Sequence, residues 1–364
     1  MPSHTIFNER PECQDRLISF LQKMGYTYVS RSEAEQKRGS LSRVIFTDEL
    51  IRFLSKQTYK YKGYELLFSG ESIQRAVNAL DASLLQGLSM ASKEIYNLLT
   101  LGISLEENVV LDNDVPVKQS FDLSFIDFEN PANNIWQVTE EFSVERPNGQ
   151  YARPDVVILV NGIPLVVIEC KKSSIDVKEG ILQNVRNMRP DYIPHLFKYA
   201  QLVLAMNPNK VVYGTCGTTA DYFVEWREDE VEWQKEICEK CTPDGRILEQ
   251  DRIAASLLDK KRLLFIIRDF ILYDSNIKKV ARHQQFFAVN NGLSSVGGSK
   301  DNTSNPAAKI TPLFKASAKS FSLINAPRPV LINIAVDFII FKRDSQTNSF
   351  VSVVSGQCKL TTSH

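Results

Sequence analysis

The chain has 364 residues, of which 43% are hydrophobic and 24% are charged, which suits a globular protein large enough for more than one domain. Basic and acidic residues both number 43, so the formal net charge is zero and any nucleic-acid footprint must be local. No apolar run approaches the length of a membrane span, and the start Met-Pro-Ser-His-Thr lacks the pattern of a signal peptide, so we expect a cytoplasmic protein without a membrane partner.

Helical spacing of apolar residues predicts four helices early in the chain, over residues 16–24, 47–54, 73–80 and 92–101. Gly25 and Gly102 are predicted to stop the first and the last of them, and Thr47 is a candidate N-cap. Strands are expected over residues 120–128 and 135–144.

The segment 153–172 follows, Arg-Pro-Asp-Val-Val-Ile-Leu-Val-Asn-Gly-Ile-Pro-Leu-Val-Val-Ile-Glu-Cys-Lys-Lys. Two apolar runs, 156–160 and 165–168, flank Asn-Gly, which is typical of a hairpin turn. The runs do not alternate with polar residues, so we expect both faces to be buried in a central sheet covered by helices. Asp155, Glu169 and Lys171 lie at the outer ends, where charges beside an apolar hairpin are costly unless they are paired or bind a cation.

The spacing of these charged residues also predicts the register of the hairpin. Glu169 and Lys171 are two apart on one strand and therefore share a face. A plain two-residue turn would set Asp155 opposite Ile168 and turn Glu169 to the other face. We therefore predict one extra residue, near Pro164, so that Asp155 lies opposite Glu169.

Two carboxylates beside a lysine indicate metal-dependent hydrolysis of phosphodiesters. Asp155 and Glu169 would supply the hard oxygen ligands that suit Mg²⁺, which can polarise a phosphate and lower the pKa of bound water. Lys171 would stabilise developing charge or help to activate the attacking water. An ordinary hairpin with solvated charged ends is the alternative, because the spacing D-x(n)-E-x-K is short and common. The Arg153-Pro154 that precedes Asp155 and the apolar strand before E-x-K favour the metal site.

Beyond the hairpin, the pattern predicts a helix over residues 176–188, strands over 202–205 and 211–214, and one long helix over 251–272. Strands, then a helix, then strands predict an α/β fold with a mixed central β-sheet flanked by helices, followed by a helical C-terminal extension. The six cysteines are expected to be free thiols. Cys238 and Cys241 form a single C-x-x-C without further ligands nearby, so we expect an incidental pair and no zinc site.

The hairpin resembles the N-terminal nuclease region of the type I restriction enzyme R subunit, a PD-(D/E)xK endonuclease. Members of that family carry R-P-D-I-V, a hydrophobic residue and x-N-G-x-P-L-V-x-I-E-x-K, which residues 153–171 match almost throughout. The resemblance includes segments at 32–35, 38–40, 44–46, 126–142, 193–201, 212–215 and 222–226, and covers roughly residues 9–289. It implies a restriction-endonuclease-like core, with Asp155 and Glu169 as Mg²⁺ ligands and Lys171 as the catalytic lysine.

The family also has a Q-x-x-x-Y motif on the helix that follows the E-x-K strand. Gln183 matches its glutamine and is expected to position substrate, with an exposed polar helix residue as the alternative. Asn187 stands where the tyrosine is usual. Nucleases of this fold often add an acidic residue from an early helix, for which Glu9 and Glu12 are candidates.

Other charged residues near the predicted site have two interpretations. Glu140, followed by Glu141, falls on the apolar face of its strand and would point toward the site, or would be a strand-edge charge. Five basic residues would contact phosphates or form a solvated helix face: Lys171, Lys172, Lys178, Arg186 and Arg189.

The resemblance predicts an endonuclease domain at residues 1–230 with its core at about 105–226, a helical linker at 231–290 and an irregular tail at 291–364. The family's ATP-driven motor should begin after residues 278–289 with a Walker A loop, but Gly292-Leu-Ser-Ser-Val-Gly-Gly-Ser has the glycine spacing without the lysine. We expect no ATP binding, and only residues 330–341 suggest a strand in the tail. We interpret the tail as a frameshift or rearrangement of a longer gene. Translating the genomic DNA in the other frames tests this, because no frame should encode a motor if the tail is a genuine variant.

The sequence thus predicts the metal-dependent DNA endonuclease part of a type I restriction–modification R subunit, a type I site-specific deoxyribonuclease without its translocase. The implied partners are double-stranded DNA and the modification and specificity subunits, the last of which sets the DNA target in this family. The alternatives are a non-catalytic fragment that docks on those subunits and a stand-alone nuclease of the same fold.

Overall fold

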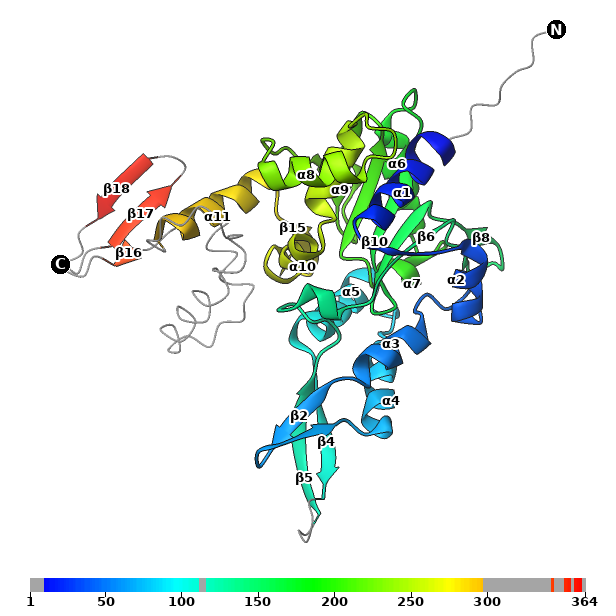
Figure 1. Ribbon diagram of the computed structural model, residues 1–364, viewed down its shortest axis with the longest axis vertical. Helices are drawn as coiled ribbons and strands as arrows, with labels where there is room; N and C mark the ends of the chain where they lie inside the picture. Colours follow the sequence, from blue (N-terminus) through cyan, green and yellow to red (C-terminus); the bar gives the residue numbers. More distant parts are fainter. Residues whose placement is uncertain (1–9, 111–115, 297–341, 344–349, 355–356, 362–364) are drawn as a thin grey trace.

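The computed structural model describes residues 10–110 and 116–296, together with short strands at 342–343, 350–354 and 357–361 (Figure 1). In chain order its elements are a π-helical turn η1 (Arg10–Gln14), α1 (Asp15–Lys23), β1 (Thr27–Val29), α2 (Arg31–Arg38), α3 (Thr47–Leu54), β2 (Thr58–Tyr61), β3 (Tyr64–Leu67), α4 (Gly70–Ala79), α5 (Leu88–Leu101), β4 (Ile103–Val109), β5 (Val117–Leu123), η2 (Pro131–Asn133), β6 (Trp136–Glu140), β7 (Val144–Glu145), β8 (Tyr151–Ala152), β9 (Val156–Val160), β10 (Ile163–Cys170), α6 (Val177–Asn187), α7 (Pro194–Phe197), β11 (Leu202–Asn207), β12 (Lys210–Gly214), η3 (Ala220–Tyr222), β13 (Val224–Glu225), α8 (Glu232–Cys241), α9 (Glu249–Leu257), α10 (Lys260–Asp269), β14 (Ile271–Asp274), β15 (Ile277–Val280), α11 (His283–Val296), β16 (Lys342–Arg343), β17 (Phe350–Val354) and β18 (Gln357–Thr361).

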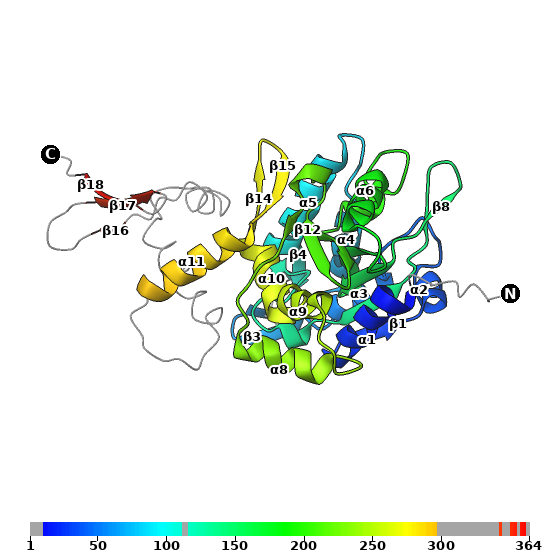
Figure 2. The ribbon, with the colours of Figure 1, turned by 90° about the horizontal axis from the view of Figure 1, so that it is seen from above.

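A seven-stranded mixed sheet forms the centre of the fold, in the order β1-β6-β9-β10-β11-β12-β13. The β1–β6 and β10–β11 pairs are parallel and the other pairs are antiparallel. Every residue of β9 and β10 is buried, as expected for central strands with both faces covered. Helix α6 packs on β10 and β11, while α1 packs on β6 and α9 on β12 (Figure 2). The predicted fold class, a mixed central sheet flanked by helices, is confirmed.

The turn between the central strands is fixed by contacts to the rest of the fold. Asn161 and Gly162 both have positive φ, 52° and 79°, as a two-residue hairpin turn requires. The Asn161 Nδ2 atom donates to the carbonyl of Phe125 at 2.9 Å and to Asn134 Oδ1 at 2.8 Å. A Cβ at Gly162 would lie 2.4 Å from the carbonyl oxygen of Phe46, so only glycine fits there.

The predicted helices in the first third occur as α1, α3, α4 and α5, with α3 at the predicted bounds. Thr47 is not its N-cap, because the cap residue is Phe46 and no side chain caps the helix. The predicted strand over residues 120–128 is shifted, since β5 spans Val117–Leu123 and pairs with β4, which was not predicted.

The single long helix predicted over residues 251–272 is wrong. Helix α9 ends at Leu257, and the Asp259 side chain accepts a hydrogen bond from the Arg262 amide at 2.9 Å as the N-cap of a new helix, α10. The segment then continues as β14, which pairs with β15. Both helices bury their apolar residues in the same core, so the helical spacing of apolar residues continues through the break. The sequence pattern therefore did not indicate where α9 ends.

The C-terminal helices pack against α1 and the central sheet. Helix α8 contacts α1, and α9 contacts both α1 and β12. Arg16 on α1 binds buried Asp251 on α9, with 3.0 Å between Nε and Oδ1. The Tyr26 hydroxyl donates to the carbonyl of Leu258 at 2.7 Å. Residues of the predicted linker therefore share the hydrophobic core of the sheet.

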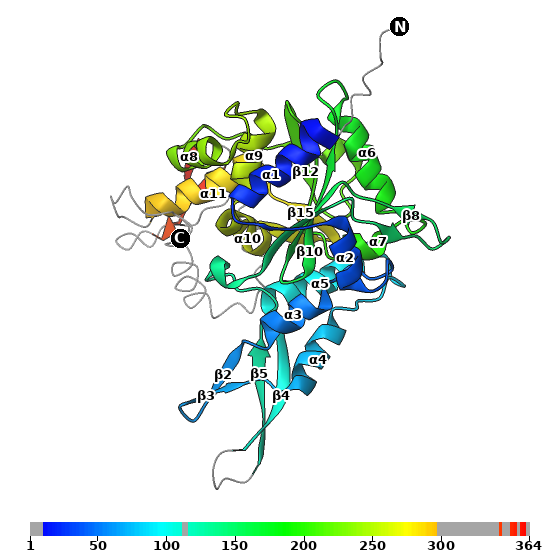
Figure 3. The same ribbon diagram turned by 45° about the vertical axis from the view of Figure 1, so that its right-hand side comes forward.

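Two hairpins, β2–β3 and β4–β5, form an arm that extends away from the sheet (Figures 1 and 3). The ring of Tyr59 on β2 stacks on Phe121 of β5 with centroids 4.1 Å apart, which joins the hairpins. Within the part of the chain that the structure describes, no helix is both long and apolar enough to cross a bilayer. The strand expected at residues 330–341 lies outside the described residues.

Lys278 on β15 is a buried cation in this core. Its Nζ atom donates to Gln201 Oε1 at 2.6 Å and to the carbonyl of Ala200 at 3.1 Å. The titratable groups around it are the thiol of Cys216 and the phenols of Tyr96 and Tyr273, none of which carries a negative charge at neutral pH. Burial without a carboxylate lowers the pKa of Lys278 to about 7.

We predict that stability rises with pH because of Lys278. Between pH 7 and about pH 10 the unfolded chain binds more protons than the folded one, so the free energy of unfolding should increase across that window. Each unit of pKa difference corresponds to about 1.4 kcal/mol, so the rise should reach several kcal/mol. Urea denaturation of Lys278→Met at several pH values should lack this rise. If the variant and the parent show the same pH dependence, the pKa of Lys278 is not lowered in the folded protein.

Candidate active site

The hairpin contains the predicted extra residue. Val160 pairs with Ile163 across the turn, the register then shifts between Pro164 and Val166, and Ile168 pairs with Val156. The next step outward sets Glu169 against Asp155. The register prediction is therefore confirmed, and Leu165 is the bulged residue.

Alternate side chains of β10 face different helices, and the bulge places Glu169 on the same face as Asp155. Glu169 lies beside Gly180 of α6, whereas Cys170, the next residue, contacts Cys13 on η1. This alternation is the normal period of a strand. Asp155, Glu169 and Lys171 consequently gather on the α6 side of the sheet.

Asp155 lies directly before β9 and is held by the strand opposite. Its Oδ2 atom accepts a hydrogen bond of 2.7 Å from the backbone N–H of Cys170. The Lys171 Nζ atom lies 3.9 Å from the same oxygen. The Asp155 side chain retains 19% of its exposure and the Lys171 side chain 9%, so this is the solvent-facing edge of the site.

Gln183 on α6 joins the predicted catalytic residues. The Lys171 Nζ atom donates to Gln183 Oε1 at 3.0 Å, which fixes the ammonium group beside Asp155. The structure therefore brings Gln183 to the site as a support for Lys171.

Glu169 is fully buried and has one carboxylate oxygen without a partner. Its Oε1 atom accepts from Asn187 Nδ2 at 3.3 Å, while Oε2 makes no hydrogen bond within the described structure. Asn187 had appeared only as a departure from the family motif. The spacing could have indicated this contact, because residues 183 and 187 are four apart on α6 and therefore share one face of the helix.

The two carboxylates have raised pKa values. Burial is the main cause of the raised pKa of Asp155, and the Cys170 amide and the Lys171 ammonium counteract it. Burial and the neighbouring Asp155 together hold the pKa of Glu169 well above its usual range. One lysine thus does not balance two buried carboxylates.

The residues present fit a divalent cation. The unpartnered Glu169 Oε2, the adjacent Asp155 carboxylate and the deficit of positive charge are what a hard cation with oxygen ligands would satisfy. Mg²⁺ is commonly held by one or two carboxylates and keeps several waters. No group of three or more His, Cys, Asp or Glu side chains arranged to hold a metal occurs among the described residues, so a metal here would depend on this pair.

The early acidic candidates do not join the carboxylate pair. The Glu12 Oε2 atom accepts from the hydroxyl and the amide of Ser173, at 3.0 and 3.2 Å, and so anchors the loop after β10. Glu9 lies outside the described residues. On β6, Glu140 accepts from the Tyr28 hydroxyl at 2.8 Å, which makes it a paired strand-end charge.

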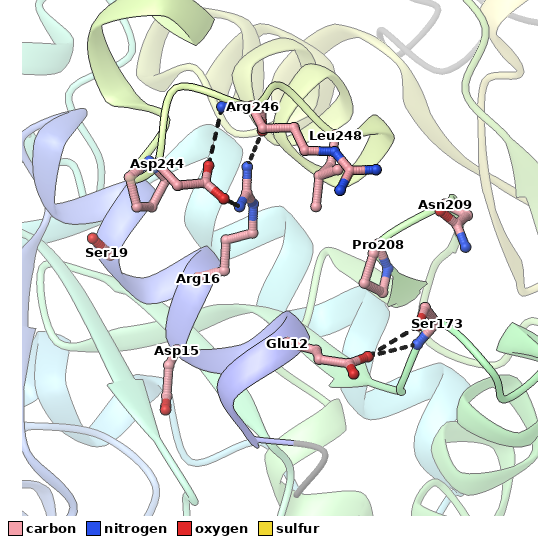
Figure 4. A pocket seen from close by; sticks show the side chains of 11 residues that line it. Glu12, Asp15, Arg16, Ser19, Ser173, Pro208, Asn209, Asp244, Arg246 and Leu248 are labelled. Atoms are coloured by element: carbon pink, nitrogen blue, oxygen red, sulfur yellow. Dashed lines mark hydrogen bonds and ion pairs between the residues drawn. The ribbon is translucent and has the colours of Figure 1, made fainter. Parts of the chain in front are cut away.

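A cavity of about 570 Å³ lies beyond Ser173, between η1, α1 and the loop before α9 (Figure 4). Glu12 points across it to Ser173, and Arg16 points to Asp244 on the other wall. Asp155, Glu169 and Lys171 do not line this cavity.

The basic candidates lie in different places. Arg186 and Arg189 stand at the C-terminal end of α6, around the ring of Tyr192. Lys178, at the other end of α6, lines a separate hollow of about 430 Å³ with Lys210 and Arg282. Arg153 forms an ion pair with Glu141 at 3.1 Å, so Glu141 already has a positively charged partner.

The fold and this arrangement define an α/β domain with a mixed central sheet and a carboxylate pair at the ends of two antiparallel strands. Comparison of the sequence with known families assigns the chain to one of them. Residues 6–222 match the model of the type I restriction enzyme R protein N terminus (HSDR_N), and the chain belongs to this family.

Its relatives are endonuclease subunits of type I restriction enzymes. A provisionally named MjaIXP subunit of Methanocaldococcus jannaschii is 27% identical over 78% of this chain and 27% of the relative. The HindI subunit of Haemophilus influenzae is 22% identical over 93% of the chain and 32% of the relative. The SauCOLORF180P subunit of Staphylococcus aureus is 34% identical over 38% of the chain and 15% of the relative. The chain thus spans no more than about a third of their length.

We predict that Glu169→Gln stabilises the protein in the absence of metal. Because the folded-state pKa of Glu169 is raised, the protonated carboxyl contributes stability at low pH that is lost as pH rises through that pKa. Glutamine keeps the shape without the charge, so the variant should be more stable at neutral pH by about 1–3 kcal/mol. Denaturation in EDTA measures this, with exposed Glu236→Gln as the control. A variant less stable than the parent would show that the carboxylate is already compensated.

Proposed function

We propose that this chain is the metal-dependent DNA endonuclease part of a type I restriction R subunit, and that it hydrolyses phosphodiester bonds in double-stranded DNA. The observation that carries the proposal is the bulge that sets Asp155 opposite Glu169 with Lys171 beside them. Family membership supports it, as does the similarity to endonuclease subunits of type I restriction enzymes. By the same family argument, the modification and specificity subunits are its proposed partners.

Asp155 and Glu169 would hold Mg²⁺, which, when bound, polarises the scissile phosphate and lowers the pKa of its water. Lys171 lies within reach of a phosphate placed beside Asp155, and its ammonium group offsets negative charge that develops on the phosphate oxygens. Gln183 keeps that ammonium group in place through its 3.0 Å hydrogen bond. Asn187 orients Glu169 so that its unpartnered oxygen remains available.

We also propose the domain assignment given by the resemblance, an endonuclease unit at residues 1–230 and a linker at 231–290. The linker helices contact helix α1 and strand β12. The linker would therefore be held rigidly against the endonuclease unit. ATP binding is not part of the proposed function.

The proposal predicts cleavage of duplex DNA that needs Mg²⁺ and both charged partners. Plasmid incubated with the chain and Mg²⁺ should be cut, and EDTA should abolish cutting. Asp155→Asn and Lys171→Ala should lower the rate at least about a hundred-fold, which is the usual size of such contributions. Agarose gels of supercoiled plasmid measure this.

Lys235→Ala serves as the matched control, because Lys235 is a half-exposed lysine on α8. It should cut at the rate of the parent. Equal background in the parent, Asp155→Asn and Lys171→Ala would contradict a catalytic role. A pull-down with modification and specificity subunits would then test a docking function instead.

For Gln183 we predict a positioning effect on turnover. Gln183→Leu keeps the size of the side chain but removes the acceptor of the Lys171 hydrogen bond. The kcat should fall roughly ten-fold with little change in KM, because a misplaced ammonium group affects the transition state more than DNA binding. Leu182→Gln, at a half-exposed neighbour on α6, should change neither constant. A rise in KM alone would assign Gln183 to DNA binding.

A further inference from the structure

Three arginines converge on a single tyrosine ring beside the candidate active site. The guanidinium carbons of Arg146, Arg186 and Arg189 lie 4.0, 5.2 and 5.8 Å from the centroid of the Tyr192 ring. Arg146 lies between β7 and β8, which precede the Asp155 strand. Arg186 lies in the last turn of α6, and Arg189 follows the helix. We call these four residues the Tyr192 cluster.

The charges in the Tyr192 cluster are only partly compensated. Arg189 pairs with Asp191 at 3.1 Å. Arg146 donates to neutral groups, the carbonyl of Asp191 at 3.3 Å and Gln150 Oε1 at 3.1 Å. The exposed Arg186 guanidinium makes no hydrogen bond or ion pair with any residue that the structure describes. The cluster therefore carries a local excess of positive charge, which attracts anions.

Stacking on tyrosine leaves the edge of a guanidinium group free to bind. The ring covers part of the guanidinium face, and the N–H groups at its edge can form paired hydrogen bonds to a phosphate. Arginine is favoured over lysine for this purpose because its fork of donors is rigid and always charged. The Tyr192 cluster thus has the chemistry of a phosphate-binding surface.

The position of the cluster connects it to the candidate active site. Asn187, which contacts Glu169, is the last residue of α6 and lies between Arg186 and Arg189 in the chain. The Arg186 guanidinium also counteracts the raised pKa of the Glu169 carboxylate. A DNA strand carries a phosphate about every 3.4 Å of helix axis, so a strand with one phosphate at Lys171 carries further phosphates past the surface that flanks the site.

We propose that the Tyr192 cluster binds the phosphodiester backbone of duplex DNA next to the bond at the Asp155–Glu169 site. This inference rests on the proposed nuclease function and adds the surface that seats the strand. Arg186 is its principal contact, and Tyr192 holds the guanidinium groups in position.

The test is binding of a short fluorescent DNA duplex to the full chain, followed by anisotropy in EDTA over a range of salt concentrations. Loss of one phosphate contact should flatten the slope of log K against log salt by about 0.9 and weaken binding roughly eight-fold at 0.1 M salt. Arg186→Gln and Arg146→Gln should each show this change. Arg252→Gln, which removes the same charge from an exposed ion pair on α9, should not.

The outcomes distinguish a failure of the proposed DNA surface from a failure of the proposed catalytic site. If Arg186→Gln and Arg146→Gln bind the duplex with the affinity and salt slope of the parent, the Tyr192 cluster is not a DNA surface, whatever the chain cleaves. If both lose affinity but Asp155→Asn cuts no less than the parent, the inference holds and the proposed catalytic site fails. A parent chain that does not bind the duplex at low salt overturns the inference directly.

Discussion

The extra residue at Leu165 is the constraint on which the candidate site depends. Without it, Ile168 would lie opposite Asp155, and Glu169 would point to the η1 side of the sheet. The bulge is held from the far end of the hairpin, because Asn161 is bonded to Phe125 and Asn134 and Gly162 abuts the Phe46 carbonyl. A turn fixed by tertiary contacts cannot slide, so the register set there is transmitted along two buried strands to the charged end.

Placing carboxylates on central strands creates an electrostatic imbalance that local groups reduce but do not remove. The Cys170 amide and the Asn187 amide group contribute hydrogen bonds, and Lys171 contributes a positive charge beside Asp155. The remaining deficit is concentrated on Glu169, the more deeply buried of the two. A sheet stabilised only for folding would carry apolar residues there, so the imbalance is a sign of a site that binds charge.

The sequence predicted the hairpin, its register and the sheet, because these depend on local pattern and on strand period. It did not reveal the contact between Asn187 and Glu169 or the convergence of Arg146 on Tyr192, since both join segments whose approach is decided by packing. The break at Asp259 was hidden for a related reason, because apolar spacing reports the buried face and not the continuity of a helix. The strands of the arm are short and half exposed, which weakens their periodic pattern.

Helix α6 explains how a departure from the family motif is accommodated. Gly180 lets the helix sit close to the sheet, since a Cβ there would lie 3.1 Å from the Ala205 side chain and 3.4 Å from Glu169. Asn184 donates to the Leu204 carbonyl at 2.9 Å, which holds the helix at this distance. With so little room, the short amide of Asn187 reaches Glu169 directly, where a tyrosine ring would need the helix to move outward. The hydrogen bond to the buried carboxylate therefore depends on a short side chain and on a helix that lies close to the sheet.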